Sequence, residues 1–187
     1  GLRRVSVLHV ETTSMRWMAY VLLTGIAWAR PIPAGYLSAC GTLDEAGPWD
    51  VSSQPHLLAY PPAALKDRTY DTCWATPQGP GSWFAVTPRL KTATFYTNGF
   101  YIANGFTRSN HDFLRNSRIR EANLELDGMT VARVRMLDQK DTQEVKLPRV
   151  IAIRPGQTLR LRFLSVYQGT HYDDCCVSEF ALLNGRH

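Results

Sequence analysis

The chain has 187 residues, 44% of them hydrophobic and 20% charged, and its formal net charge is +5. This length suits one domain with a hydrophobic core and is short for two, and the composition excludes a disordered chain. Without Arg3, Arg4, Glu11 and Arg16, 18 basic and 15 acidic residues remain, an excess too small to predict a nucleic-acid partner.

The first predicted element is an apolar segment near the N-terminus. Residues 17–29, WMAYVLLTGIAWA, carry no charge and follow the basic residue Arg16. Such a run is too short to cross a bilayer, which takes about 20 residues, but it suits the core of a secretory signal. We expect a signal segment over residues 1–29, with Met15 as the natural start and cleavage after the small-x-small triplet at residues 27–29. A buried helix is the less favoured alternative.

A second export signal overlaps the first. Residues 37–40, LSAC, resemble the lipobox of bacterial lipoproteins, in which the cysteine is acylated. This alternative would extend the signal to residue 39 and make Cys40 a lipid anchor, the single contact with a membrane that we expect. Arg30, Pro31 and Pro33 interrupt the apolar run before the box, so secretion and lipid anchoring stay open. Both place the protein outside the cytoplasm, secreted or at the cell envelope.

The remaining sequence predicts an all-β domain over residues 49–185, after a linker rich in Pro, Gly and small residues at 30–48. Its apolar residues recur with a period of two, which is typical of strands with one buried face. The clearest candidates are 123–126, 132–136 and 159–163, and the shorter ones are 83–86, 92–96, 100–103, 145–147, 150–153 and 177–182. Turn signals lie at Asn98-Gly99, Asp127-Gly128 and Pro155-Gly156. Because no helical stripe follows Ala29, we expect an antiparallel jelly-roll β-sandwich.

The four cysteines lack the paired spacing of a zinc site. In an oxidising compartment they can form disulfides. Cys175 and Cys176 are neighbours, and such pairs rarely bond to each other, so at least one of them reaches elsewhere. Our hypothesis is a bridge between Cys73 and Cys176, which leaves the partner of Cys175 open. We expect Trp74 and Trp83 to pack in the core.

Five stretches carry a resemblance to a known family. They are LKDRTYDTCW at 65–74, GSWF at 81–84, IANGF at 102–106, NSRIR at 116–120 and SVYQGTHYDDCCVSE at 165–179. In this order they resemble discoidin-like (coagulation factor type C) domains of the galactose-binding-like fold. The closest likeness is to the translocation, or glycan-binding, domain at the front of secreted bacterial NAD glycohydrolases. The resemblance implies the jelly-roll module without the toxin activity, since no catalytic domain follows in this sequence.

The resemblance also implies a structural calcium ion held by Asp67, Thr72 and Glu179. A tight loop offers carbonyl and carboxylate oxygens of the kind Ca²⁺ prefers. The loop departs from the family, because Arg68 replaces a glycine and Thr69 replaces an acidic residue. The alternative is that Asp67 caps the turn and Glu179 pairs with an arginine.

Two groups of residues are candidates for ligand binding. Tyr172, Asp173 and Asp174 combine an aromatic ring with carboxylates, which suits sugar recognition, although aspartates in turns also bond to backbone amides. The second group flanks the polar loop 107–114 and consists of Asn104, Asn116 and Arg118; its alternative role is to hold that loop. Loops at one end of a jelly roll commonly bind ligands.

We therefore predict a non-catalytic carbohydrate- or surface-binding module of an exported bacterial protein, with a glycan or cell-surface ligand as its partner. A structural or protein-interaction module that aids translocation or assembly is the alternative. A hydrolase using Asp173 or Glu179 is less favoured, because the adjacent carboxylates Asp173 and Asp174 point opposite ways on extended backbone and cannot pair across a cleft.

Overall fold

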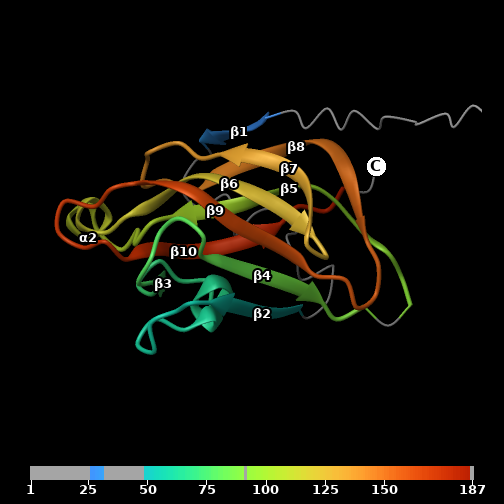
Figure 1. The fold of residues 1–187 in the computed structure, drawn as a ribbon, viewed down its shortest axis with the longest axis horizontal. Coiled ribbons are helices and arrows are strands. Elements are labelled where there is room, and N and C mark those ends of the chain that lie inside the picture. The colour runs from blue at the N-terminus through green and yellow to red at the C-terminus, as the bar shows by residue number, and fades with distance from the viewer. Residues whose placement is uncertain (1–25, 32–48, 91, 186–187) are drawn as a thin grey trace, which may run out of the picture.

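The computed structural model describes residues 26–31, 49–90 and 92–185. Its strands are β1 (Ile26–Pro31), β2 (Trp49–Gln54), β3 (Trp74–Thr76), β4 (Trp83–Pro88), β5 (Phe95–Asn104), β6 (Arg118–Leu126), β7 (Met129–Arg135), β8 (Gln143–Ile153), β9 (Leu159–Tyr167) and β10 (Cys175–Leu182). Two short helices, the 3₁₀ helix η1 (Pro62–Lys66) and the α-helix α2 (Asn110–Arg115), lie between strands. The strands form two antiparallel sheets, β2-β4-β9-β6-β7 and β8-β5-β10-β3, which pack as a sandwich (Figure 1).

The predicted all-β sandwich is confirmed, and the differences are local. Residues 95–96 of the predicted strand 92–96 and the segment 100–103 belong to the single strand β5, and 145–147 and 150–153 belong to β8. The predicted turn at Asn98-Gly99 is wrong, since the register of β5 shifts there as a bulge without a reversal of the chain. Gly99 is required at the bulge, because a Cβ atom would clash with the carbonyl oxygen of Val145.

The other two predicted turns are present. Asp127 and Gly128 have φ angles of +48° and +86° and join β6 to β7. These are the left-handed conformations that a two-residue hairpin turn requires. Pro155-Gly156 lies between β8 and β9, and the φ of Gly156 is +82°.

Aromatic rings dominate the core between the sheets. The rings of Trp74, Phe84 and Phe163 meet edge to face, with centroids 5.6 to 6.1 Å apart. Trp74 is fully buried, and its Nε1 donates to the Oγ of Ser53 at 2.9 Å, which satisfies its polar group. Trp83, also predicted in the core, is only half-buried and packs against the guanidinium of Arg160, 4.3 Å from the ring centroid.

Strand β1 joins the two sheets. It pairs in parallel with β7 through Ile26–Trp28 and antiparallel with β8 through Ala29–Pro31. The rest of the predicted signal segment and linker, including Met15 and Cys40, lies outside the described residues. Among the residues described, no helix has the length and apolar character needed to cross a membrane.

Helix α2 lies at one end of the sandwich, beside the loop that joins β9 to β10 (Figure 1). The Oγ of Ser109 accepts a hydrogen bond from the backbone amide of Asp112 at 3.0 Å, which caps the first turn. Phe113 is buried and anchors the helix. This end of the molecule carries the side chains considered below.

Candidate functional site

Tyr172 is the exposed aromatic residue of the loop between β9 and β10. Its side chain is 42% exposed. The Nη2 of Arg115 donates to its hydroxyl at 2.9 Å, and the guanidinium lies 4.8 Å from the ring centroid. The ring of His171 meets it edge to face at 4.5 Å. Arg115, at the end of α2, therefore fixes the ring that the sequence singled out.

The two aspartates that follow Tyr172 differ in exposure. Asp173 is exposed, and its Oδ1 accepts a hydrogen bond from Nε2 of Gln168 at 2.6 Å. Asp174 is half-buried, and its backbone carbonyl accepts from the amide of Ser117 at 2.9 Å. Tyr172 and Asp173 thus present polar groups to solvent, whereas the backbone of Asp174 holds the loop.

The two asparagines of the second predicted group are buried. The side-chain amide of Asn104 donates to the carbonyl of Ile119 at 2.8 Å and accepts from its amide at 3.0 Å. The Nδ2 of Asn116 donates to the carbonyl of Asp112 at 2.8 Å at the end of α2. Both amides peg the loop between β5 and β6, which is the alternative role considered for them.

Arg118, the third member of that group, is only 4% exposed. Its Nε and Nη2 donate to the carboxylate of Asp138 at 2.6 to 3.0 Å, and its Nη1 donates to the carbonyl of Asn116 at 3.0 Å. The guanidinium also stacks on the ring of Phe113 at 4.7 Å. These contacts occupy the side chain within the protein.

The residues expected to hold calcium lie together, where the loop after η1 meets β10. The Oε1 of Glu179 accepts the backbone amide of Arg68 at 2.6 Å, and Asp67 accepts from the hydroxyl of Thr72. Burial and the neighbouring Asp67 raise the pKa of Glu179 to about 8. Arg68 has a φ of +64°, a left-handed conformation that favours glycine.

The three cysteines in the described part of the chain are buried thiols. Cys73 and Cys176 belong to one small cluster with Ala75 and Phe106, and a hydrogen bond with Cys73 raises the pKa of the Cys176 thiol. Cys175 lies in the main core, where burial raises its pKa. The alternation of β10 therefore points the neighbouring thiols to opposite sides.

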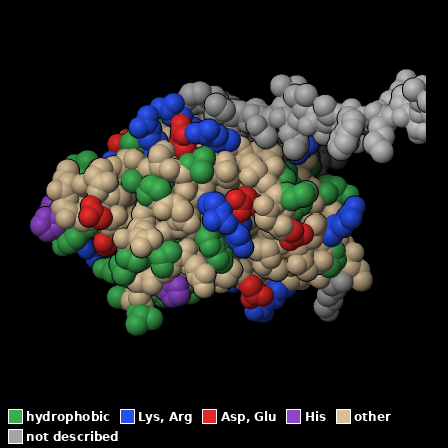
Figure 2. Space-filling model, viewed as in Figure 1, with side chains coloured by type: hydrophobic (Ala, Val, Ile, Leu, Met, Phe, Trp, Pro, Cys, Tyr) green, Lys and Arg blue, Asp and Glu red, His purple; other side chains and the backbone are tan. Residues whose placement is uncertain are grey.

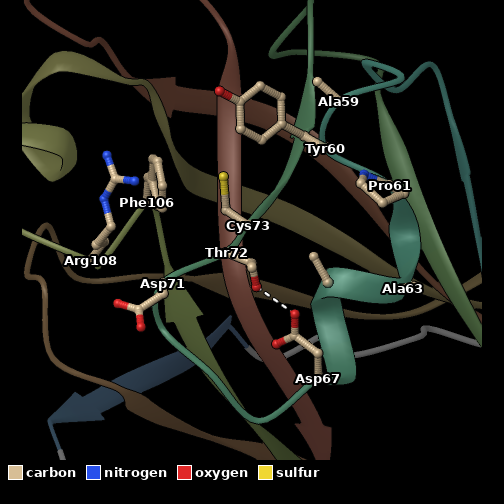
Figure 3. A pocket seen from close by; sticks show the side chains of 11 residues that line it. Ala59, Tyr60, Pro61, Ala63, Asp67, Asp71, Thr72, Cys73, Phe106 and Arg108 are labelled. Atoms are coloured by element: carbon tan, nitrogen blue, oxygen red, sulfur yellow. Dashed lines mark hydrogen bonds between the residues drawn. The ribbon is translucent and has the colours of Figure 1, made fainter.

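A pocket of about 330 Å³ lies on the side of η1, and sequence reasoning missed it. Figure 3 shows Tyr60 and Phe106 above Asp71, Thr72 and Asp67, with Arg108 beside Phe106. The full lining consists of Ala59, Tyr60, Pro61, Ala63, Ala64, Asp67, Asp71, Thr72, Cys73, Phe106 and Arg108. No spacing along the chain could have revealed it, because three separate segments form it.

Charged side chains are mixed on the surface. On the face shown in Figure 2, acidic groups lie among the basic ones. On the outer side of the β6–β7–β9 sheet, Arg133 pairs with Glu121 at 2.6 Å and Arg162 with Glu125 at 2.9 Å. These ion pairs offset part of the positive charge on the arginines of the strands, and Glu125 also lies 3.7 Å from Arg160.

Residues 48–183 match the family described as the NAD glycohydrolase translocation F5/8 type C domain. The chain belongs to this family. The family description names a translocation domain and no catalytic domain, which agrees with the predicted non-catalytic module. No curated protein sequence matches this translocation domain.

Solved structures share its fold. The family 32 carbohydrate-binding module (CBM) of NanJ from Clostridium perfringens, in complex with galactose, is 14% identical with a TM-score of 0.51, covering 72% of this chain and 92% of that one. A CBM32 module of GH89 from the same organism, in complex with GalNAc-β-1,3-galactose, is 13% identical with a TM-score of 0.57, covering 74% and 96%. The two CBM32 domains of C. perfringens ZmpB, in complex with GalNAc, are 12% identical with a TM-score of 0.59, covering 83% and 38%.

Proposed function

We propose that this translocation domain is a carbohydrate-binding module of an exported bacterial protein, with its sugar site at Tyr172. The observation that carries the proposal is the exposed ring of Tyr172, held by Arg115 and followed in the same loop by the exposed carboxylate of Asp173. An aromatic ring offers an apolar surface to a sugar, and the guanidinium, amide and carboxylate groups hydrogen-bond to hydroxyls. The groups are positioned before a ligand arrives, which lowers the cost of ordering them.

Galactose and N-acetylgalactosamine are the first sugars to test, because they are bound by proteins of the same fold. The experiment is a glycan-array screen of the full chain, followed by titration calorimetry with these two sugars. Tyr172→Ala and Asp173→Asn are expected to weaken binding by about tenfold or more.

Tyr96→Ala is the matched control. Tyr96 is 41% exposed, as Tyr172 is, but it lies eight residues before Asn104 on β5, about 26 Å from that end of the strand. Its loss is expected to leave binding unchanged. Absence of saturable binding by the folded chain, or equal effects of the two tyrosine variants, would overturn the proposal and favour a structural or protein-interaction module.

The calcium proposal concerns Asp67, Thr72 and Glu179. Two carboxyl groups face each other there: burial, and then the hydrogen bond with Asp67, raise the pKa of Glu179, and a bound cation would favour the ionised form of both groups. Among the described residues no group of three His, Cys, Asp or Glu side chains is arranged to hold a metal, so backbone carbonyls and water would supply further oxygens. Calorimetric titration of the metal-free chain with Ca²⁺, compared with Glu179→Gln, tests the site.

Export and the Cys73–Cys176 disulfide remain part of the same proposal. The contact between these two thiols supports the pairing. Mass spectrometry of the N-terminal peptide from the native host distinguishes the two modes of export. Secretion with cleavage after Ala29 gives an N-terminus at residue 30 without lipid, whereas lipid anchoring gives an acylated Cys40 at the N-terminus.

A further inference from the structure

We infer that the pocket between η1 and α2 is a second sugar site, separate from Tyr172, and that it takes one neutral pyranose residue. The inference shares the class of ligand with the proposed function but uses different residues from the Tyr172 site, while Asp67 and Thr72 belong both to this pocket and to the proposed calcium site. Arg108 precedes α2 and lines the pocket, whereas Arg115 ends α2 and holds Tyr172. The helix thus separates the two sites, and each can be removed without touching the other.

The size of the pocket matches a single sugar. Its volume of about 330 Å³ is at the lower end of the range for small-molecule sites. Its walls come from the segment before and within η1, the loop before β3, and the loop between β5 and α2 (Figure 3). Loops held by a β-sandwich at three points form a concave surface that exists before a ligand binds.

Two aromatic rings supply the apolar wall. Tyr60 is 37% exposed, and its ring meets that of Phe106 edge to face, with centroids 6.5 Å apart. Pro61 and Ala63 continue this wall. An exposed tyrosine fixed against a buried phenylalanine leaves apolar surface in the opening, which suits the C–H face of a pyranose ring.

Arg108 and Asp71 supply the polar groups. The guanidinium of Arg108 stacks on Phe106 at 4.6 Å, and its Nε donates to Asp112 at 3.0 Å, so the side chain is held in place. Neither its Nη atoms nor the carboxylate of Asp71 has a hydrogen-bond partner among the described residues. A donor and an acceptor on one rim can bind adjacent hydroxyls of a sugar.

The charge balance selects a neutral ligand. Asp112 already pairs with Arg108 at 3.0 Å. The carboxylates of Asp67 and Asp71 also line the pocket, so in the metal-free chain, with chelator present, its remaining charge is negative. A sugar that carries a carboxylate would meet repulsion there, whereas a neutral sugar would not.

The experiment isolates the pocket in full-length Tyr172→Ala, which lacks the proposed loop site. Saturation-transfer NMR and calorimetry are run with galactose, N-acetylgalactosamine and galacturonic acid at millimolar concentrations. We expect at least one neutral sugar to bind, galacturonic acid to bind about tenfold more weakly, and Tyr60→Ala or Asp71→Asn added to Tyr172→Ala to abolish the signal. Asp71 is exposed and Asn has the same shape, so this variant keeps its fold, which thermal unfolding checks.

Each outcome separates the pocket from the loop site. If Tyr172→Ala loses all sugar binding while the unmodified chain still binds, the pocket is not a sugar site and the proposed function is retained. The pocket assignment is also wrong if binding persists in both pocket variants, Tyr60→Ala and Asp71→Asn, or if galacturonic acid binds more tightly than the neutral sugars. Binding unaffected by Tyr172→Ala but lost in Tyr60→Ala supports the pocket and overturns the loop site. Absence of binding by the unmodified chain overturns both.

Discussion

The backbone amide of Arg68 donates to the Oε1 of Glu179 at 2.6 Å, which ties the loop after η1 to the last strand. The loop can present this amide because Arg68 has a φ of +64°. A residue with a Cβ pays a steric cost in this conformation. The loop therefore has a glycine-like conformation at a position that holds an arginine.

This strain predicts a difference between two small substitutions at position 68. Arg68→Gly relieves the strain and Arg68→Ala keeps it, while both remove the arginine side chain. The steric cost of about 1 to 2 kcal/mol exceeds the entropy cost of glycine, so we expect the Gly variant to have a free energy of unfolding about 0.5 to 1 kcal/mol higher than the Ala variant. Urea unfolding of both variants measures the difference. An Ala variant as stable as the Gly variant would contradict it.

The raised pKa of Glu179 predicts that stability falls as the pH rises. The pKa of Glu179 is about 8 in the folded state, whereas the ordinary pKa of a glutamate, expected in the unfolded chain, is 4.5. Between these values the folded state binds more protons than the unfolded state, so the stabilisation present below the lower pKa is lost as pH rises through the higher one. The slope for one proton is at most about 1.4 kcal/mol per pH unit.

Urea unfolding across this window, with chelator present, measures the slope, and Glu179→Gln is expected to flatten it. Added Ca²⁺ is expected to stabilise the unmodified chain most at the alkaline end, where Glu179 is ionised, and to leave Glu179→Gln unchanged. If calcium stabilised both chains equally, it would bind elsewhere.

Arg118 is expected to respond to a conservative substitution because it is buried. Arg118→Lys loses the two-pronged bond to Asp138 and the bond to the carbonyl of Asn116, at a cost of about 2 kcal/mol in the free energy of unfolding. Arg133→Lys is the control, because the exposed pair with Glu121 contributes less than about 1 kcal/mol. Sugar affinity of the folded Arg118→Lys chain is expected to stay unchanged, and a tenfold loss would return Arg118 to the ligand site.

Oxidation is expected to join Cys73 to Cys176 and to leave Cys175 as a thiol. The bridge would close a loop of about 100 residues, for which the chain-entropy model gives about 4 to 5 kcal/mol of stabilisation. Peptide mapping after alkylation in denaturant identifies the pair, and comparison with Cys73→Ser measures the gain. A bridge that contained Cys175 would contradict the separation of the thiols across β10.

Strands with one buried face could be predicted from the sequence because burial of that face imposes a period of two on apolar residues. Strand β2, WDVSSQ, lacks this alternation and was not predicted, and β3 has only three residues. Helix α2 spans six residues, too few for an apolar stripe. The bulge at Gly99 depends on a contact with Val145 on another strand, which no local pattern records.

The candidate site could be predicted only where a residue's role is local. Tyr172 and Asp173 lie in an exposed loop, as expected. Asn104 has the residue type of a ligand-binding group, but its amide bonds to Ile119, fifteen positions later, and this depends on the packing of β5 against β6. Tyr60, Asp71 and Arg108 meet only in the folded chain.

Strand β1 has a consequence for assembly. Its pairs with β7 come from Ile26–Trp28 and its pairs with β8 from Ala29–Pro31. Cleavage after Ala29 would therefore remove every residue that β1 contributes to the edge of β7. An uncovered strand edge recruits strands from other chains. The precursor and the processed protein would then differ in self-association. In the precursor, residues 26–28 cover the edge of β7, whereas cleavage after Ala29 would leave this edge available to a strand of another molecule.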